Sequence, residues 1–124
     1  MNNEMIGQSK EDYLEAILMT IHEKGDCRVT DVANLLHYSK PSVSVAVKKL
    51  EEEGYVMRHG THISLTESGT VIAERMLKRH TLLSTWLKSI GIEEAVADDE
   101  ACEMEHIFSD DSFERIADFI KERS

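Results

Sequence analysis

Residues 28–56 read RVTDVANLLHYSKPSVSVAVKKLEEEGYV, and this stretch decides the fold. It predicts two short helices separated by a tight break at residues 37–39. The second helix begins at Lys40 and Pro41, because proline is well tolerated in a first turn whose N–H groups have no partner within the helix. The apolar residues of this helix recur at helical spacing and are predicted to face inward: Val43, Ala46, Val47 and Leu50.

The opposite face of the second helix is small, polar and positively charged. Short hydroxyl side chains allow a helix to sit deep in the major groove of DNA, and lysines reach phosphates. Two short helices with such a surface are typical of a helix-turn-helix. We expect DNA contacts from Ser39, Lys40, Pro41, Ser42, Ser44, Lys48, Lys49 and Arg58. The alternative is any three-helix bundle that has a serine-rich surface.

After Gly54 the pattern changes from helical to alternating in YVMRHGTHISLT, residues 55–66. Alternation on both sides of residues 59–61, His-Gly-Thr, predicts a β-hairpin with a glycine turn. A further amphipathic helix is predicted upstream, over residues 9–24. Three helices followed by a hairpin is the order of a winged helix. We therefore expect a winged helix-turn-helix domain with a small β-hairpin wing over residues 1–66.

Residues 67–124 are predicted to form an all-α domain, which makes the fold class mainly α. A long helix is expected from Glu67 to Ile90. The acidic segment 93–101 is expected to be a turn that leads into a helix over residues 100–108, and Ser112 is expected to cap a last helix. The apolar faces of these helices are broad enough to pack on a second copy, which favours a dimerisation domain.

Cys102, Glu105 and His106 lie in DEACEMEHIFSDD, residues 99–111, on one predicted helical face. Thiolate, carboxylate and imidazole are all ligands for divalent transition metals. Three donors within one turn do not complete a coordination sphere. The other candidate ligands are Asp12, Glu15 and His80. Each feature has a plain alternative, because acids stabilise first helical turns, a histidine on an apolar face is usually packed, and an acidic helix is usually solvated.

These segments together resemble the metal-dependent transcriptional repressors of the diphtheria toxin repressor and manganese transport regulator family, over nearly the whole chain. EDYLEAI at 11–17 is similar to the family's first-helix motif, and SKPSVSVAVKKLEEEGYV at 39–56 to its recognition helix and wing entry. LTESGTVIAERMLKRHTLL at 65–83 is similar to the link into its dimerisation helices. DEACEMEHIFSDD completes the match.

The resemblance implies a set of metal ligands, residue by residue. Asp12 and Glu15 match the two first-helix carboxylates of the manganese-type members. His80 matches the ligand on the long helix, while Glu105 and His106 match the ligands of the EH pair.

Cys102 departs from the manganese type, which has glutamate there, and agrees with the iron type. The iron type in turn has methionine, glutamate and histidine where this chain has Asp12, Ser84 and Asp98. Carboxylates favour harder ions such as Mn²⁺, whereas a thiolate favours Fe²⁺, Co²⁺, Ni²⁺ or Zn²⁺. The implied site is therefore a hybrid. We expect one or two ions per subunit, with Fe²⁺ or Mn²⁺ in the cell and Zn²⁺, Co²⁺ or Ni²⁺ possible in vitro.

The resemblance implies a repressor that binds double-stranded operator DNA as a homodimer when loaded with metal, and that controls metal homeostasis genes. The alternative is a metal-independent winged-helix regulator whose acidic cluster is structural. A metal-dependent hydrolase is disfavoured by the absence of HExxH and nucleophile-elbow motifs, so we expect neither an enzyme nor an organic substrate. A metal buffer without DNA binding is disfavoured by the helix at 39–50.

The composition sets further limits. The formal charge is −10, so DNA binding must use a local basic patch or follow the neutralisation of acids. The sequence has no apolar run of membrane-spanning length and no signal peptide, and its two cysteines do not make a disulfide framework. We expect a reduced cytoplasmic protein with no membrane partner.

Overall fold

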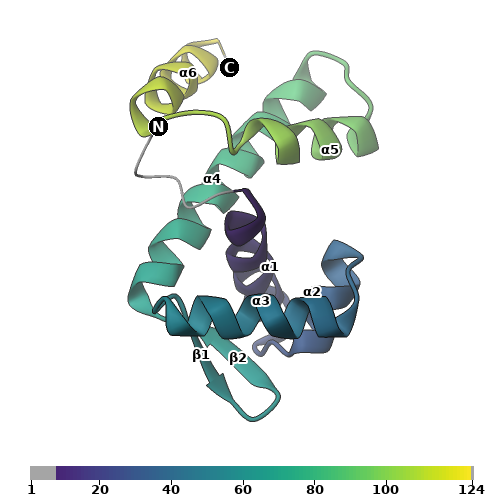
Figure 1. Cartoon of the computed structure of the whole chain (residues 1–124). Coiled ribbons are helices and arrows are strands. Elements are labelled where there is room, and N and C mark those ends of the chain that lie inside the picture. The colour runs from purple at the N-terminus through teal and green to yellow at the C-terminus, as the bar shows by residue number, and fades with distance from the viewer. Residues whose placement is uncertain (1–7, 124) are drawn as a thin grey trace. The chain divides into compact units, whose positions relative to one another are not determined.

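The computed structural model describes residues 8–123, which divide into two compact units (Figure 1). The first unit runs to Arg75, and the second begins at Met76. The first holds α1 (Gln8–Lys24), α2 (Val29–Leu36), α3 (Lys40–Glu52), β1 (Val56–His59), β2 (His62–Leu65) and the start of α4 (Glu67–Ser89). The second holds the rest of α4, α5 (Glu94–Met104) and α6 (Asp110–Glu122). The predicted fold class is confirmed: a mainly α chain with a hairpin after its third helix.

Helix α3 begins where the sequence predicted. Ser39 is extended at φ −73° and ψ 150°, and its Oγ accepts a hydrogen bond from the N–H of Ser42, with Pro41 in the first turn. The break before it is made by His37, which closes α2 in the left-handed region at φ 60°. The inward residues of α3 are Val43, Val47 and Leu50, all fully or almost fully buried. The fourth expected inward residue, Ala46, is half-buried.

The hairpin has the predicted glycine turn. Strands β1 and β2 pair antiparallel with His59 opposite His62, so the turn consists of Gly60 and Thr61. Gly60 has φ +66°, a conformation that glycine adopts at little cost. Figure 1 shows the hairpin as a narrow extension beside the end of α3.

The connection between α1 and α2 anchors β2. The N–H of Ile63 donates to the carbonyl of Cys27 at 2.9 Å, and His62 Nδ1 lies 2.8 Å from an oxygen of Asp26. The hydrogen bond with His62 holds the pKa of the Asp26 carboxyl below its usual range. Burial raises the pKa of the Cys27 thiol to about 12, so this cysteine stays protonated at neutral pH and packs in the core.

The backbone at Tyr55, just before β1, passes very close to the start of α4 at Gly69. A Cβ at Gly69 would overlap the carbonyl of Tyr55. The same crossing is fixed by Thr66, whose N–H donates to that carbonyl at 3.1 Å and whose Oγ1 donates to the carbonyl of Gly54 at 2.7 Å. Glycine is required here for space and not for a left-handed conformation.

We predict that Gly69→Ala destabilises the protein by about 2 kcal/mol or more, because the new methyl group must push the backbone of Tyr55 away. Thermal unfolding followed by circular dichroism measures the loss. The matched control is Gly25→Ala, because a Cβ there meets nothing within 4 Å. This substitution costs only the strain of a side chain on a backbone at φ +81°. A melting temperature for Gly69→Ala equal to or above that of Gly25→Ala would contradict this explanation.

The core of the second unit is built where α4 meets α5 and α6. Its buried members are Leu83, Leu87, Ala97, Ala101, Phe113 and Ala117. The small residues of α5 lie four apart on one face, which allows this helix to pack closely.

The predicted limits of α5 are wrong. The segment that was expected to be a turn up to residue 101 is helical from Glu94, and the helix ends at Met104 and not at Phe108. Glu93 caps the start, because its side chain accepts from the N–H of Ala95 at 3.2 Å. The acidic composition suggested a turn, but the burial of Ala97 and of Ala101, one turn later, stabilises a helix instead.

The predicted cap of the last helix is also wrong. Ser109, and not Ser112, is the N-cap of α6, and its Oγ accepts from the N–H of Ser112 at 3.1 Å. With this start the buried residues Phe113, Ala117 and Ile120 follow a spacing of four and three, which places them on one face.

Candidate metal centre and DNA-binding surface

Seven of the eight predicted DNA contacts lie at the start of α3 or along it, and the eighth, Arg58, lies in β1. Six of the eight are exposed: Ser39, Lys40, Pro41, Ser42, Lys48 and Lys49. The other two, Ser44 and Arg58, are half-buried. The acids that follow at the end of α3 are partly neutralised, because Lys10 pairs with Glu53 at 2.7 Å. A basic and hydroxyl-bearing helix surface is therefore available despite the acidic net charge.

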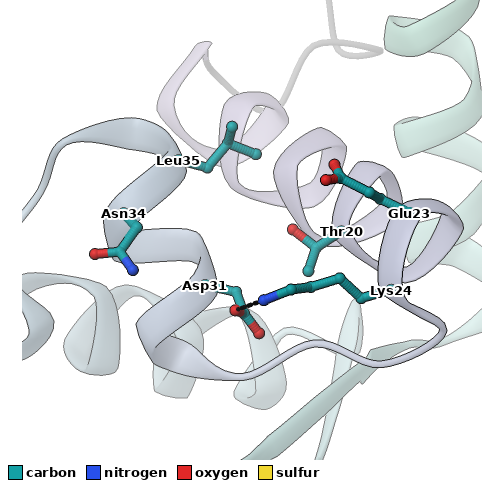
Figure 2. A pocket seen from close by; sticks show the side chains of 6 residues that line it. All are labelled: Thr20, Glu23, Lys24, Asp31, Asn34 and Leu35. Carbon is teal, nitrogen blue, oxygen red and sulfur yellow. Dashed lines mark hydrogen bonds and ion pairs between the residues drawn. The ribbon is translucent and has the colours of Figure 1, made fainter.

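A shallow hollow of about 270 Å³ lies between the end of α1 and α2 (Figure 2). Figure 2 shows Lys24 reaching across it to Asp31, and the two side chains pair at 2.7 Å. Asp31 also accepts the N–H of Arg28 at 2.9 Å, at the start of α2. Both hydrogen bonds, that from Lys24 first, hold the pKa of Asp31 below its usual range. The pair of Lys24 and Asp31 thus joins the end of α1 to α2.

We predict that Asp31→Asn lowers stability at pH 7 by about 1 kcal/mol, the range of partly exposed pairs and helix caps. Because the folded pKa of Asp31 is depressed, its contribution is present above the unfolded pKa and is lost as pH falls through the folded pKa. Urea unfolding at pH 7 and near pH 3 should therefore show a gap between wild type and variant that closes in acid. A gap that widens in acid would contradict the assignment.

His80 and Glu105 form the centre of the donor cluster in the second unit. His80 Nδ1 lies 3.0 Å from Glu105 Oε1, and the Glu105 side chain is fully buried while that of His80 is about a quarter exposed. His80 belongs to α4, and Glu105 is the residue that closes α5. An imidazole and a carboxylate from two different elements thus converge on one point.

Cys102 and His106 supply two further donors in the same unit. Cys102 lies in the last turn of α5 and is exposed, whereas His106 follows the helix end and is almost fully buried. The thiol sulfur and a ring nitrogen of His106 lie within 4.8 Å of each other. The expected single helical face is not found in this form, because α5 stops before Glu105. The three residues are nevertheless brought together around the helix end.

The first unit carries the other two predicted ligands, Asp12 and Glu15, three residues apart on one side of α1. Glu15 is buried and Asp12 is half-buried. A carboxylate that is removed from water needs compensating partners, so these acids are not a solvated surface.

The donor set of the second unit fits a divalent transition ion. His80 and Glu105 would each offer one ligand atom to such an ion, an imidazole nitrogen and a carboxylate oxygen that lie 3.0 Å apart. Both are donor types that Mn²⁺ and Fe²⁺ accept. His106 and Cys102 form a second pair of donors, an imidazole and a thiolate, whose ligand atoms lie within 4.8 Å of each other.

Two family models match this chain, one in each half. The model described as "Iron dependent repressor, N-terminal DNA binding domain" matches residues 5–62, and "Iron dependent repressor, metal binding and dimerisation domain" matches residues 66–124. An HTH-type transcriptional regulator MntR from Bacillus pumilus is 37% identical over 118 residues, which cover 94% of this chain and 82% of the relative. The chain belongs to the iron-dependent repressor family. A second MntR, from Shouchella clausii, is 38% identical over 91% of this chain and 80% of its own length.

Solved structures of this family have the same fold. A "Manganese-dependent transcriptional repressor complex with manganese" is 33% identical with a TM-score of 0.78, and covers 90% of this chain. The structure of the manganese regulator SloR has the same TM-score at 29% identity. This chain spans about half the length of each of these two proteins, 52% and 53%.

Family membership confirms the function class read from the sequence. This iron-dependent repressor is a metal-dependent transcriptional regulator with a DNA-binding domain followed by a metal-binding and dimerisation domain, and it is not an enzyme. The alternative of a metal-independent winged-helix regulator is disfavoured. No helix within residues 8–123 is both long and apolar enough to cross a membrane.

Ser84 and Asp98, two positions at which the resemblance implies a departure from the iron type, bond to each other in this repressor. Ser84 Oγ donates to Asp98 Oδ1, and Lys88 lies 3.2 Å from the same oxygen. These partners, Ser84 first, hold the pKa of the Asp98 carboxyl below its usual range. The carboxylate is thus kept ionised by groups of the chain itself.

Arg79, next to His80 in α4, is a polar residue of this region that the sequence reading missed. It is almost fully buried and bonds the segment that carries Glu105 and His106. The signal was present, because Arg79 lies between the buried residues Met76 and Leu83 on the apolar stripe of α4. A charged residue at such a position requires specific partners.

Proposed function

We propose that this chain is a homodimeric repressor that binds operator DNA when loaded with Mn²⁺ or Fe²⁺, and that it controls metal homeostasis genes in the cytoplasm. The observation that carries the proposal is the convergence of His80 on the buried Glu105, with buried His106 alongside, in the half matched by the metal-binding model. The exposed basic face of α3, in the half matched by the DNA-binding model, supports the DNA partner.

The proposed ligands come from both domains. They are Asp12, Glu15, His80, Cys102, Glu105 and His106. We place the domain boundary at residues 66 and 67, so that the carboxylates of α1 belong to the DNA-binding domain, residues 1–66, and the other donors to the dimerisation domain, residues 67–124. When bound, a divalent cation supplies two positive charges and directional coordination.

Ligation by side chains of both domains gives the metal control over DNA binding. It restrains each DNA-binding domain on the dimerisation domain, and hence the separation of the two recognition helices in a dimer. DNA half-sites have a fixed spacing, so a fixed separation favours binding. By linkage, operator DNA strengthens metal binding by the same factor.

Charge acts in the same direction. The formal charge of −10 becomes −11 when the Cys102 thiolate is counted, and −7 after two divalent ions bind. The protein stays acidic, so its contacts with phosphates must come from the lysines and hydroxyls of α3 and from Arg58.

The choice of metal rests on the mixed donor set. Asp12 and Glu15 favour Mn²⁺, whereas the Cys102 thiolate favours Fe²⁺ and, in vitro, Zn²⁺, Co²⁺ or Ni²⁺. The mutual bonding of Ser84 and Asp98 supports the manganese-type ligand set, because these positions already satisfy each other. We propose one or two ions per subunit.

The test of the function is fluorescence anisotropy on a labelled duplex from the upstream region of the gene. The protein is titrated with chelator present, then with Mn²⁺, with Fe²⁺ under anaerobic conditions, and with Zn²⁺. Tight binding only in the presence of metal supports the proposal. Equal binding with chelator would reduce the cluster to a structural role.

We predict that Cys102→Glu shifts the ranking of activating ions toward Mn²⁺, because a hard carboxylate replaces a soft thiolate beside His106. The half-activating concentrations of Mn²⁺ and Zn²⁺ are compared in the anisotropy assay. Cys102→Ser is the control that removes the thiolate without adding a carboxylate. A ranking that is the same in all three proteins would exclude Cys102 as a determinant of metal choice.

We predict that Lys48→Ala weakens DNA binding and lowers the slope of log affinity against log salt by about 1, because one phosphate contact is lost. The matched control is Lys121→Ala, which removes an exposed lysine of α6. Binding in the presence of metal is measured at several salt concentrations. An unaltered slope for Lys48→Ala, or an equal change for Lys121→Ala, would refute the assignment of this lysine.

A further inference from the structure

Arg79 is a buried cation that bonds the short connection between α5 and α6 and the first residue of α6. Its Nη1 donates to the carbonyls of Glu105, at 3.1 Å, and Phe108, at 2.8 Å. Its Nη2 pairs with Asp110 Oδ1 at 2.6 Å. The guanidinium also lies over the ring of Phe113, 5.1 Å from the centroid.

These bonds satisfy main-chain carbonyls that lie outside both helices. Glu105 follows the end of α5 at Met104, and Phe108 precedes Ser109, the N-cap of α6, and buried carbonyls in such segments need partners from elsewhere. Arg79 takes the carbonyl of Glu105 and that of Phe108, and it reaches Asp110 in the first turn of α6. One side chain of α4 thereby fixes the path of the chain from residue 105 to residue 110.

His80, the residue that follows Arg79 in α4, also bonds Glu105. His80 bonds the carboxylate of Glu105, and Arg79 bonds the backbone carbonyl of Glu105. Both the side chain and the main chain of this proposed ligand are therefore fixed from two successive positions of one helix. His106 follows directly in the chain and is held in the same segment.

We propose that Arg79 is a positioning residue of the metal centre, which holds Glu105 and His106 in the arrangement that a divalent ion requires before the ion binds. The inference rests on the proposed function. A segment that is already ordered does not lose conformational freedom on binding, so fixing it raises affinity. Groups that orient metal ligands typically change metal affinity 10- to 100-fold when removed.

The planar guanidinium is needed for this role. It presents several donors in a fixed fork, so it can bond two carbonyls and a carboxylate together. A lysine at this position keeps the charge but has a single donor group on a flexible stem. Arg79→Lys should therefore keep the fold and weaken Mn²⁺ binding roughly 10-fold.

A second variant avoids any change inside the core. Asp110 is about half exposed, so Asp110→Asn removes an ionic partner of Arg79 from the outside. Asp111→Asn is the matched control, because Asp111 lies in the same first turn of α6. Its ion pair is an exposed i,i+4 contact with Arg115 and does not involve Arg79. We expect Asp110→Asn to weaken Mn²⁺ binding about threefold or more and Asp111→Asn to leave it unchanged.

Two measurements on the full-length chain separate positioning from plain structure. Isothermal titration calorimetry gives the Mn²⁺ affinity, and hydrogen exchange on the metal-free protein gives the protection of amides 105–110. Arg79→Lys and Asp110→Asn should both speed exchange in this segment and weaken Mn²⁺ binding, while Asp111→Asn does neither.

The outcomes that overturn the proposal differ from those that overturn the function. A lower melting temperature with Mn²⁺ affinity and segment exchange as in the wild type would make Arg79 structural only. Wild-type protein that binds neither Mn²⁺ nor Fe²⁺ would overturn the proposed function and the positioning role with it. Normal wild-type binding that neither variant changes would overturn the positioning role alone.

Discussion

Two successive side chains of α4 bond opposite ends of Glu105, and the donor cluster of the second unit depends on this arrangement. His80 bonds its carboxylate and Arg79 bonds its carbonyl. A buried guanidinium that loses its partners costs several kcal/mol, so the connection between α5 and α6 has little freedom to move away from α4. The apolar cluster around Leu83 and Phe113 then packs α5 and α6 on the same helix.

The first unit is organised by a few specific contacts, some between neighbours in the sequence and some between distant residues. Ser39 starts α3 and so sets which residues face outward, and Gly69 allows the start of α4 to cross the backbone before β1. His62 ties β2 to Asp26 in the connection between α1 and α2. Each contact acts on the orientation of the helix-turn-helix or the wing, so the DNA-binding surface depends both on the local cap of α3 and on the long-range pair of His62 and Asp26.

The sequence predicted those parts in which local signals agree. The inward face of α3 and the glycine turn of the hairpin were found because proline, valine spacing and alternation all indicated the same structure. The start of α5 was missed because a run of acids is compatible with a turn as well as with the first turn of a helix, and the burial of Ala97 against α4 decides it. Ser109 and Ser112 are both capable of capping α6, and the burial of Phe113 with Ala117 and Ile120 favours the first.

The candidate site, too, was predicted from the sequence only in part. The spacing of Cys102, Glu105 and His106 indicated metal ligation, and Asp12, Glu15 and His80 were candidates for the remaining donors that the family resemblance then implied. Spacing alone could not show that Glu105 lies beyond the helix end, because this depends on where α5 stops. Arg79 was not found, since its role comes from partners 26 to 31 residues away in the chain.

The proposed donors of the site differ in burial and in the number of bonds that hold them in place. Glu105 is fully buried and bonded at both ends, and His106 is buried next to it, so these two fix where an ion would sit. Cys102 is exposed in the last turn of α5 and has more freedom to adjust. Under the proposed ligand set, geometry is therefore imposed by the buried carboxylate and imidazoles, which suit Mn²⁺ and Fe²⁺ alike, while the thiolate changes only the softness of the site. For this reason the substitution at residue 102 tests the metal preference of the repressor without dismantling the centre itself.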